Sequence, residues 1–135
     1  MKRATYRYIE AEIYDYPSTV EEITRLRQEI IEGGSPDDTQ TRVQSNRLSD
    51  PTADRATRLV MDKRLRRLEE VRNAIDRVYQ NLDPDRKRLV EMKYWEKRLT
   101  HTGIAEDLHI GERTFYRWKD DVVKAVALEL GLLKT

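Results

Sequence analysis

Residues 99–118, LTHTGIAEDLHIGERTFYRW, carry the strongest structural signal in this chain. Their apolar residues recur at helical spacing on both sides of His109-Ile110-Gly111. Thr100 is a suitable N-cap for a helix that ends near residue 108, and a second helix is expected over about 112–130. The stretch therefore predicts two helices joined by a tight connection.

The apolar residues of this stretch fit a helix-turn-helix, in which two helices cross around a short turn and the second is exposed along its N-terminal half. Ala105 is expected where the helices approach closely, because a larger side chain would force them apart. His109 occupies a turn position that favours glycine, and histidine tolerates positive φ at modest cost. The expected core is Ile104, Ala105, Leu108, Ile110, Phe115, Trp118 and Val122.

Polar residues on the open face give this helix pair a candidate function. Arginine can bond guanine O6 and N7, glutamate can accept from cytosine N4, and threonine or tyrosine can contact phosphate or a thymine methyl. Lysines beyond them, and the basic run over 86–88, would contact phosphates. Asp120 is expected on the same exposed face. The candidate DNA-binding residues are Thr102, Glu112, Arg113, Thr114, Tyr116, Arg117, Lys119 and Lys124.

The rest of the sequence also predicts helices. Tyr6, Ile9 and Ile13 predict a first helix that ends at Tyr16-Pro17, because the residue before proline avoids helical geometry. A second helix is expected from a capping box of Ser18 and Glu21. Its apolar stripe is Val20, Ile23, Leu26 and Ile30, and it stops at Gly33-Gly34.

A long helix is expected from Pro51 to Leu82, with proline at its first position. Its apolar seam, Met61, Leu65, Leu68, Val71, Ile75, Val78 and Leu82, resembles that of a coiled coil. Such a stripe must pack on the preceding helix, on a second copy of the chain, or on both. A further helix over about 84–96 should bury Leu89, Met92 and Trp95.

These elements predict an all-α protein with an N-terminal helical or coiled-coil region and a C-terminal helix-turn-helix. The expected parts are N-terminal helices over 1–32, a flexible polar loop over 33–50, a long dimer or bundle helix over 51–82 and a DNA-binding domain over 83–135.

Composition excludes several classes of protein. There is no cysteine, which rules out disulfides and thiolate zinc sites. No apolar run is long enough for a membrane span and no secretory signal is visible, so we expect a cytoplasmic protein with no membrane partner. His101 and His109 lack an aligned carboxylate, and no nucleophile stands beside a base. We therefore expect no enzyme, catalytic residue, metal or cofactor.

Residues 82–131, LDPDRKRLVEMKYWEKRLTHTGIAEDLHIGERTFYRWKDDVVKAVALELG, resemble the fourth conserved region of bacterial sigma factors. The whole chain resembles phage transcriptional regulators of the RinA and ArpU type, with the loosest resemblance before residue 82. The resemblance implies a phage or prophage activator of late genes that binds double-stranded DNA and acts with host RNA polymerase. The chain lacks the other sigma regions, so it would not replace a sigma factor. We expect a homodimer or higher homo-oligomer.

Three alternatives stay open at this point. In the first alternative, the two helices over 99–130 form a helical hairpin within a larger bundle, and the spacing of their apolar residues serves packing alone. Small terminase subunits, which recognise packaging DNA as rings, also join a helix-turn-helix to coiled-coil helices, though usually with the DNA-binding part first. The net charge of only +1 also fits a module that binds RNA polymerase rather than DNA.

Overall fold

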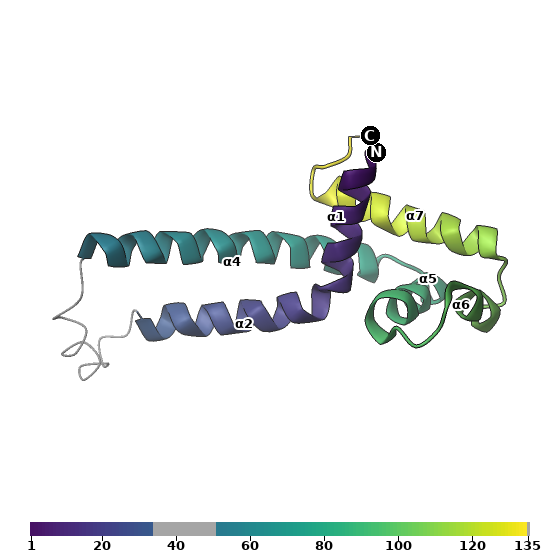
Figure 1. The fold of residues 1–135 in the computed structure, drawn as a ribbon, viewed down its shortest axis with the longest axis horizontal. Coiled ribbons are helices and arrows are strands. Elements are labelled where there is room, and N and C mark those ends of the chain that lie inside the picture. The colour runs from purple at the N-terminus through teal and green to yellow at the C-terminus, as the bar shows by residue number, and fades with distance from the viewer. Residues whose placement is uncertain (34–50, 135) are drawn as a thin grey trace. The chain divides into compact units, whose positions relative to one another are not determined.

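The computed structural model describes residues 1–33 and 51–134, and within these ranges the chain is all-α, with no strand (Figure 1). The expected all-α class is thereby confirmed. Apart from Gly33, the expected polar loop lies outside the described residues. The elements are α1 (Arg3–Tyr14), α2 (Tyr16–Gly33), α4 (Pro51–Gln80), α5 (Pro84–Val90), the π-helical segment η1 (Glu91–Glu96), α6 (His101–Asp107) and α7 (Glu112–Glu129).

The chain divides into two compact units. One comprises Met1–Pro17 with Glu70–Thr135, and the other comprises Ser18–Glu69. The first unit therefore joins α1 to the C-terminal helices, although most of the sequence separates them. No helix among the described residues is long and apolar enough to cross a membrane.

The second unit pairs residues 18–33 of α2 with residues 51–69 of α4, and the two segments run antiparallel (Figure 1). Thr19, Ile23 and Leu26 are buried at helical spacing on α2. Ion pairs join Arg27 to Glu69 and Arg64 to Glu22 along the edges of this pair. The apolar stripe expected on α2 thus packs within the chain, with Thr19 buried more deeply than the expected Val20.

The junction of α1 and α2 differs from the expectation. Helix α1 ends at Tyr14 and α2 already begins at Tyr16, so Ser18 lies inside the first turn of α2 and the expected capping box is wrong. Pro17 fits this first turn because the amide that proline lacks would have no partner there. Tyr16 is held by stacking on Trp95 and by a hydrogen bond that its hydroxyl donates to Asp76.

The core of the first unit lies between α1, the last turns of α4, α5, η1 and α7. Ile9 and Ile13 of α1 meet residues of α4 and α7 that are almost fully buried. Helix α4 ends at Gln80 rather than at Leu82, yet Leu82 still packs against this core. The buried members on α4 and α7 are Val71, Ile75, Val78, Val122, Val123, Val126 and Ala127.

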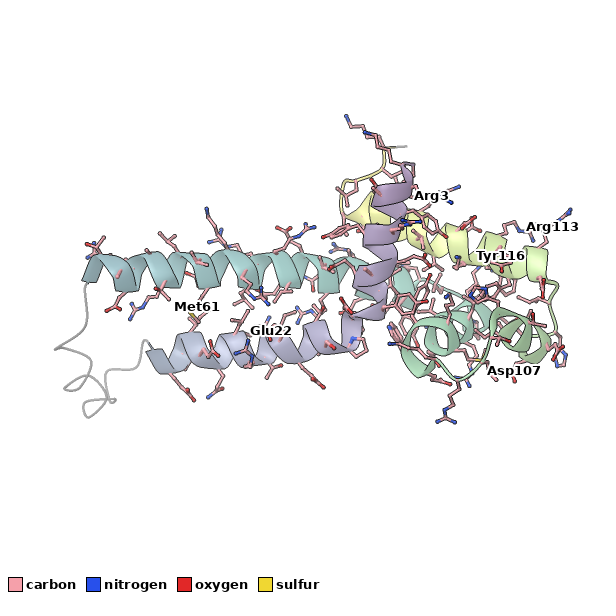
Figure 2. All side chains as sticks on the ribbon, in the orientation of Figure 1. Arg3, Glu22, Met61, Asp107, Arg113 and Tyr116 are labelled. Carbon is pink, nitrogen blue, oxygen red and sulfur yellow. The ribbon has the colours of Figure 1, made fainter. Side chains whose placement is uncertain are left out.

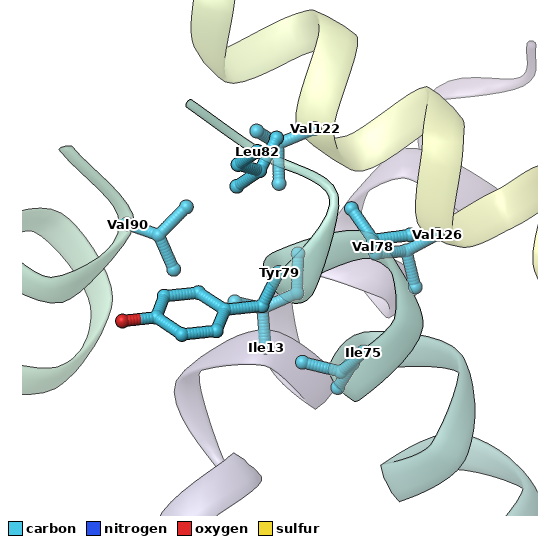
Figure 3. A pocket seen from close by; sticks show the side chains of 8 residues that line it. All are labelled: Ile13, Ile75, Val78, Tyr79, Leu82, Val90, Val122 and Val126. Carbon is cyan, nitrogen blue, oxygen red and sulfur yellow. The ribbon is translucent and has the colours of Figure 1, made fainter. Parts of the chain in front are cut away.

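A small apolar cavity of about 10 Å³ lies within this core. Figure 3 shows Tyr79 and Val90 among the eight side chains that line it. The lining contributes no polar surface, and the cavity has at most the volume that a single water occupies. We regard it as a packing gap rather than a ligand site.

The segment expected as one helix over 84–96 changes its winding at Glu91, where α5 gives way to η1. Leu89, Met92 and Trp95 point inward as expected, with Trp95 half-buried. The π-helical turn also buries Tyr94 completely and lets Trp95 Nε1 donate to the Ile13 carbonyl, at 3.0 Å. Such turns are rare, and helical periodicity alone does not predict them.

Candidate nucleic-acid interface

A second apolar cluster holds α6 against α7. Leu89, Met92, Ile104, Ala105 and Phe115 are buried in it, and Leu108, Ile110 and Trp118 pack around them. The cluster thus contains every residue expected in the core of the helix pair except Val122, which belongs to the first core instead. Val122 lies two turns beyond Phe115 on α7, about 10 Å along the axis, and so reaches the side of α1 and α4.

The ends of α6 and α7 follow the local sequence. The Thr100 side chain accepts a hydrogen bond from the Gly103 amide at 3.1 Å, which confirms it as an N-cap. His109 has φ of 56°, the positive value expected at this turn. The Ile110 amide donates to the Ala105 carbonyl at 3.0 Å and closes the connection. Gly131, with φ of 74°, follows the end of α7.

The N-terminal half of α7 presents four of the eight candidate DNA-binding residues to solvent. Glu112, Arg113, Tyr116 and Arg117 are exposed there, and Lys124 is exposed two turns further on. Arg113 projects from the start of the helix (Figure 2). Arg113, Arg117 and Lys124 make no hydrogen bond or ion pair with another described residue. Thr114 is half-buried.

Two side-chain contacts join the start of α6 to the start of α7. Thr102 donates to the Glu112 carboxylate at 2.7 Å, and His101 Nδ1 lies 3.0 Å from the Tyr116 hydroxyl. Burial, followed by the charges of Lys93 and Lys119, lowers the pKa of His101 below its usual value. These contacts fix the orientation of the groups on the open face.

Lys119 and Asp120 are engaged with α1. The Lys119 side chain is only 14% exposed, and its Nζ lies 3.6 Å from the Glu10 carboxylate. Asp120 was expected on the exposed face but is half-buried, and it accepts a hydrogen bond from the Tyr6 hydroxyl. Periodicity could not show this because it depends on a helix more than a hundred residues away in sequence.

The basic run over 86–88 also makes contacts within the chain. Arg86 stacks over the Trp118 ring at 4.4 Å and pairs with Asp83. Arg88 pairs with both Glu91 and Glu96. These arginines therefore stabilise the fold before any partner is bound, whereas the cations at the start of α7 do not.

An open groove runs beside the exposed start of α7. The residues that line it are Tyr14, Lys93, Lys97, Leu99, Thr100, His101, Thr102, Glu112 and Tyr116. The ammonium group of Lys93 donates to the Tyr14 hydroxyl at 2.6 Å, and the Lys97 ammonium lies over the same ring. Sequence reasoning did not place Tyr14, Lys93 or Lys97 at this surface.

The profile of the family described as "Protein of unknown function (DUF722)" matches residues 7–127. The chain belongs to this family. The match to DUF722 begins within α1 and ends within α7, so it includes both apolar clusters.

A curated protein, "Transcriptional activator rinA" of Staphylococcus phage phi11, is 28% identical to this DUF722 chain over 134 residues. The alignment covers 97% of this chain and 94% of the phage protein, so the two agree over nearly their whole lengths. The resemblance to RinA-type regulators is thereby confirmed. No solved structure matches the chain.

Proposed function

We propose that this protein is a phage-encoded transcriptional activator that binds specific duplex DNA through α7. The observation that carries the proposal is the exposed start of α7, where Arg113 and Arg117 have no partner among the described residues. The name of the relative from phage phi11 supports the activator role. The function is one of binding, with no catalytic step.

In this proposal α6 and α7 form a helix-turn-helix, and α7 enters the major groove with its N-terminal half. Arg113 and Arg117 bond guanine O6 and N7, and Lys124 contacts phosphate. The Thr102 hydroxyl donates to one oxygen of the Glu112 carboxylate, so the other oxygen remains to accept from cytosine N4. Tyr116 and Thr114 lie beside the arginines for phosphate or thymine-methyl contacts.

We further propose that the activator acts in the cytoplasm of the bacterial host, at late genes and together with host RNA polymerase, as the family resemblance implies. Residues 83–135 would carry DNA binding, while the helices over 1–32 and 51–82 would supply a dimer or bundle surface. Leu59 and Val60 of the second unit are 60% and 66% exposed, and a second copy would cover them. A dimer would read half-sites about 10 base pairs or a multiple apart.

The experiment that tests the proposal is selection of bound duplexes from a random library with the full chain, followed by affinity measurements over a salt series. A recovered motif with a spaced repeat supports a site-specific dimer. Salt-dependent binding without a motif contradicts site specificity and favours a packaging role such as that of a small terminase. If no duplex is retained, the α6–α7 pair binds a protein such as RNA polymerase, and DNA binding by this chain alone is wrong.

The activator role needs a separate measurement. A reporter gene placed behind the recovered site should respond to the intact protein in a bacterial host. The R113A/R117A variant should leave the reporter at its basal level, since it removes both partnerless arginines at the start of α7. Reduced expression with the intact protein would instead show a repressor.

A further inference from the structure

The arginines of α1 form a second group of cations beside α7. Arg3 and Arg7 are exposed and make no hydrogen bond or ion pair with another described residue. They lie three positions before Tyr6 and Glu10, respectively, and residues at that spacing share a helix face. Tyr6 and Glu10 are the α1 residues that bind Asp120 and Lys119 of α7. Arg3 and Arg7 therefore emerge on the side of α1 that borders α7.

The cations of α7 form a matching row. Arg113, Arg117, Asp120 and Lys124 follow one another at spacings of four, three and four, so they lie along one strip of the helix. Asp120, the single acid in this strip, accepts a hydrogen bond from Tyr6. The two cation rows thus meet near the Tyr6–Asp120 contact, and Figure 2 labels Arg3 on α1 and Arg113 at the start of α7.

The distance along α7 from Arg113 to the contact with α1 is similar to the width of the DNA major groove. Seven residues separate Arg113 from Asp120 (120 − 113), which is about 10 Å along a helix. The major groove of B-DNA is about 12 Å wide, and phosphates line its edges. If α7 places Arg113 over the base pairs, the crossing with α1 comes to the edge of the groove.

Resting on the function proposed above, we infer that α1 is part of the DNA-binding surface and that Arg3 and Arg7 bind phosphates at the edge of the groove that α7 enters. The other residues of this crossing are already satisfied: Lys119 pairs with Glu10, and Glu10 also accepts a hydrogen bond from the Tyr94 hydroxyl at 2.7 Å. Among the exposed side chains of this surface without a partner among the described residues, Asp121 is acidic, whereas Arg3, Arg7, Arg117 and Lys124 are basic, so the free charge there is positive on balance. Its contribution to binding is independent of base sequence, because phosphates are common to every sequence.

The test compares the full-length R3Q/R7Q variant with the wild type on two duplexes of about 30 base pairs, roughly three helical turns. One carries the selected motif and the other has mixed sequence. Each phosphate contact contributes about 0.9 to the slope of log affinity against log salt, so the slope should fall by about 1.8 on both duplexes. By the same relation the variant should bind roughly 10-fold to 100-fold more weakly at about 0.1 M salt.

Two further variants make the comparison specific. K63Q/R66Q removes two exposed cations of α4 that also have no partner among the described residues. They lie on the same helix face as Leu59, so the mass of this variant in solution is measured first. With the oligomeric state of the wild type, it should leave the slope unchanged. R3K/R7K keeps both charges and should retain most of the slope. The far-ultraviolet circular dichroism of all variants should match the wild type, since none of the replaced side chains makes a hydrogen bond or ion pair with another described residue.

Each of the following results would overturn the inference. An unchanged slope for R3Q/R7Q, an equal loss for K63Q/R66Q, or a loss confined to the selected motif contradicts phosphate binding by α1 while leaving binding by α7 intact. Unchanged DNA binding with a lost reporter response assigns Arg3 and Arg7 to a protein partner instead. If the wild type binds neither duplex, the inference fails together with the proposed function.

Discussion

The hydroxyl group of Tyr6, on the first helix of the chain, donates a hydrogen bond to the carboxylate of Asp120 near the middle of α7. The Lys119–Glu10 pair lies beside it, one residue earlier on α7 and four residues later on α1. Two polar contacts therefore join α1 to α7, in addition to the apolar contacts that Ile9 and Ile13 make in the core. The position of the helix that we propose to bind DNA depends on the first residues of the chain.

Replacement of Tyr6 by phenylalanine should lower the free energy of unfolding by about 1–2 kcal/mol. A hydrogen bond to a charged group contributes about 1.5–3 kcal/mol, and partial exposure of this pair reduces that value. Denaturant unfolding followed by circular dichroism measures the change. Asp120→Asn should cost a similar amount, and the double variant should cost less than the sum because both changes remove the same contact.

Asp121 provides the matched control for this prediction. It adjoins Asp120 but is exposed and has no partner among the described residues, so Asp121→Asn should change stability by less than about 0.5 kcal/mol. Equal losses for the two aspartates would mean that net charge matters and the Tyr6 contact does not.

The protein should lose stability as the pH rises above about 10, the ordinary pKa of tyrosine. Burial, followed by hydrogen bonding to Asp120, raises the pKa of Tyr6, and burial with hydrogen bonding to Asp76 raises that of Tyr16 to about 12. The pKa of Tyr94 is raised by burial and by its bond to Glu10. A raised folded pKa contributes stability that is present below the unfolded value and lost as the pH rises through the folded value.

Denaturant unfolding measured at intervals between about pH 8 and pH 12 tests this expectation. Tyr16→Phe should lower stability at neutral pH but make its decline above pH 10 less steep, because one of the titrating groups is gone. A stability that stays constant through this range would show that the tyrosine–carboxylate contacts do not persist in solution.

The imidazole of His101 should titrate below its ordinary pKa of about 6.5. Its partial burial and the nearby charges of Lys93 and Lys119 disfavour the protonated form. The stability linked to His101 is therefore present above about pH 6.5 and is lost as the pH falls. Nuclear magnetic resonance of the ring protons gives the midpoint directly. Lys93→Gln should move it upward, and a wild-type midpoint at or above 6.5 would contradict the packing of His101 against Phe115 and Tyr116.

Enlarging Ala105 should destabilise the contact between α6 and α7. Ala105 is 3% exposed and lies in the cluster with Ile104 and Phe115, so the three additional carbons of leucine have no room. Ala105→Leu should cost about 1–3 kcal/mol and weaken DNA binding through loss of the helix geometry. Ala4→Leu places the same side chain at an exposed position of α1 and should change stability little. Equal melting temperatures for the two variants would place Ala105 outside any tight contact.

The sequence was sufficient to predict the α6–α7 pair because its signals are local. The Thr100 cap, the positive φ at His109 and the apolar spacing from Ile104 to Trp118 each depend on residues within one or two turns. The start of the long helix at Pro51 was equally predictable, since proline favours the first helical position.

Contacts between distant segments could not be predicted in this way. Nothing near Tyr6 in the sequence identifies Asp120 as its partner, and nothing near Trp95 identifies the carbonyl of Ile13. The π-helical turn at 91–96 is equally hidden, because it is stabilised by tertiary packing rather than by its own residues. The same limit applies to Val122, whose helical spacing from Phe115 predicts one shared cluster although Val122 packs in the other core.

Single replacements on α7 should distinguish residues that read bases from residues that bind phosphates. Arg113→Ala and Arg117→Ala should each cost about 1–3 kcal/mol on the selected duplex and relax the preference at one base pair, if these arginines bond guanine. Lys124→Ala should weaken binding to all sequences alike and reduce the salt slope by about 0.9. Competition between the selected duplex and duplexes with single base-pair changes measures both effects. If Arg113→Ala and Arg117→Ala behave as Lys124→Ala does, with equal losses on every sequence, then α7 binds the backbone and does not read bases.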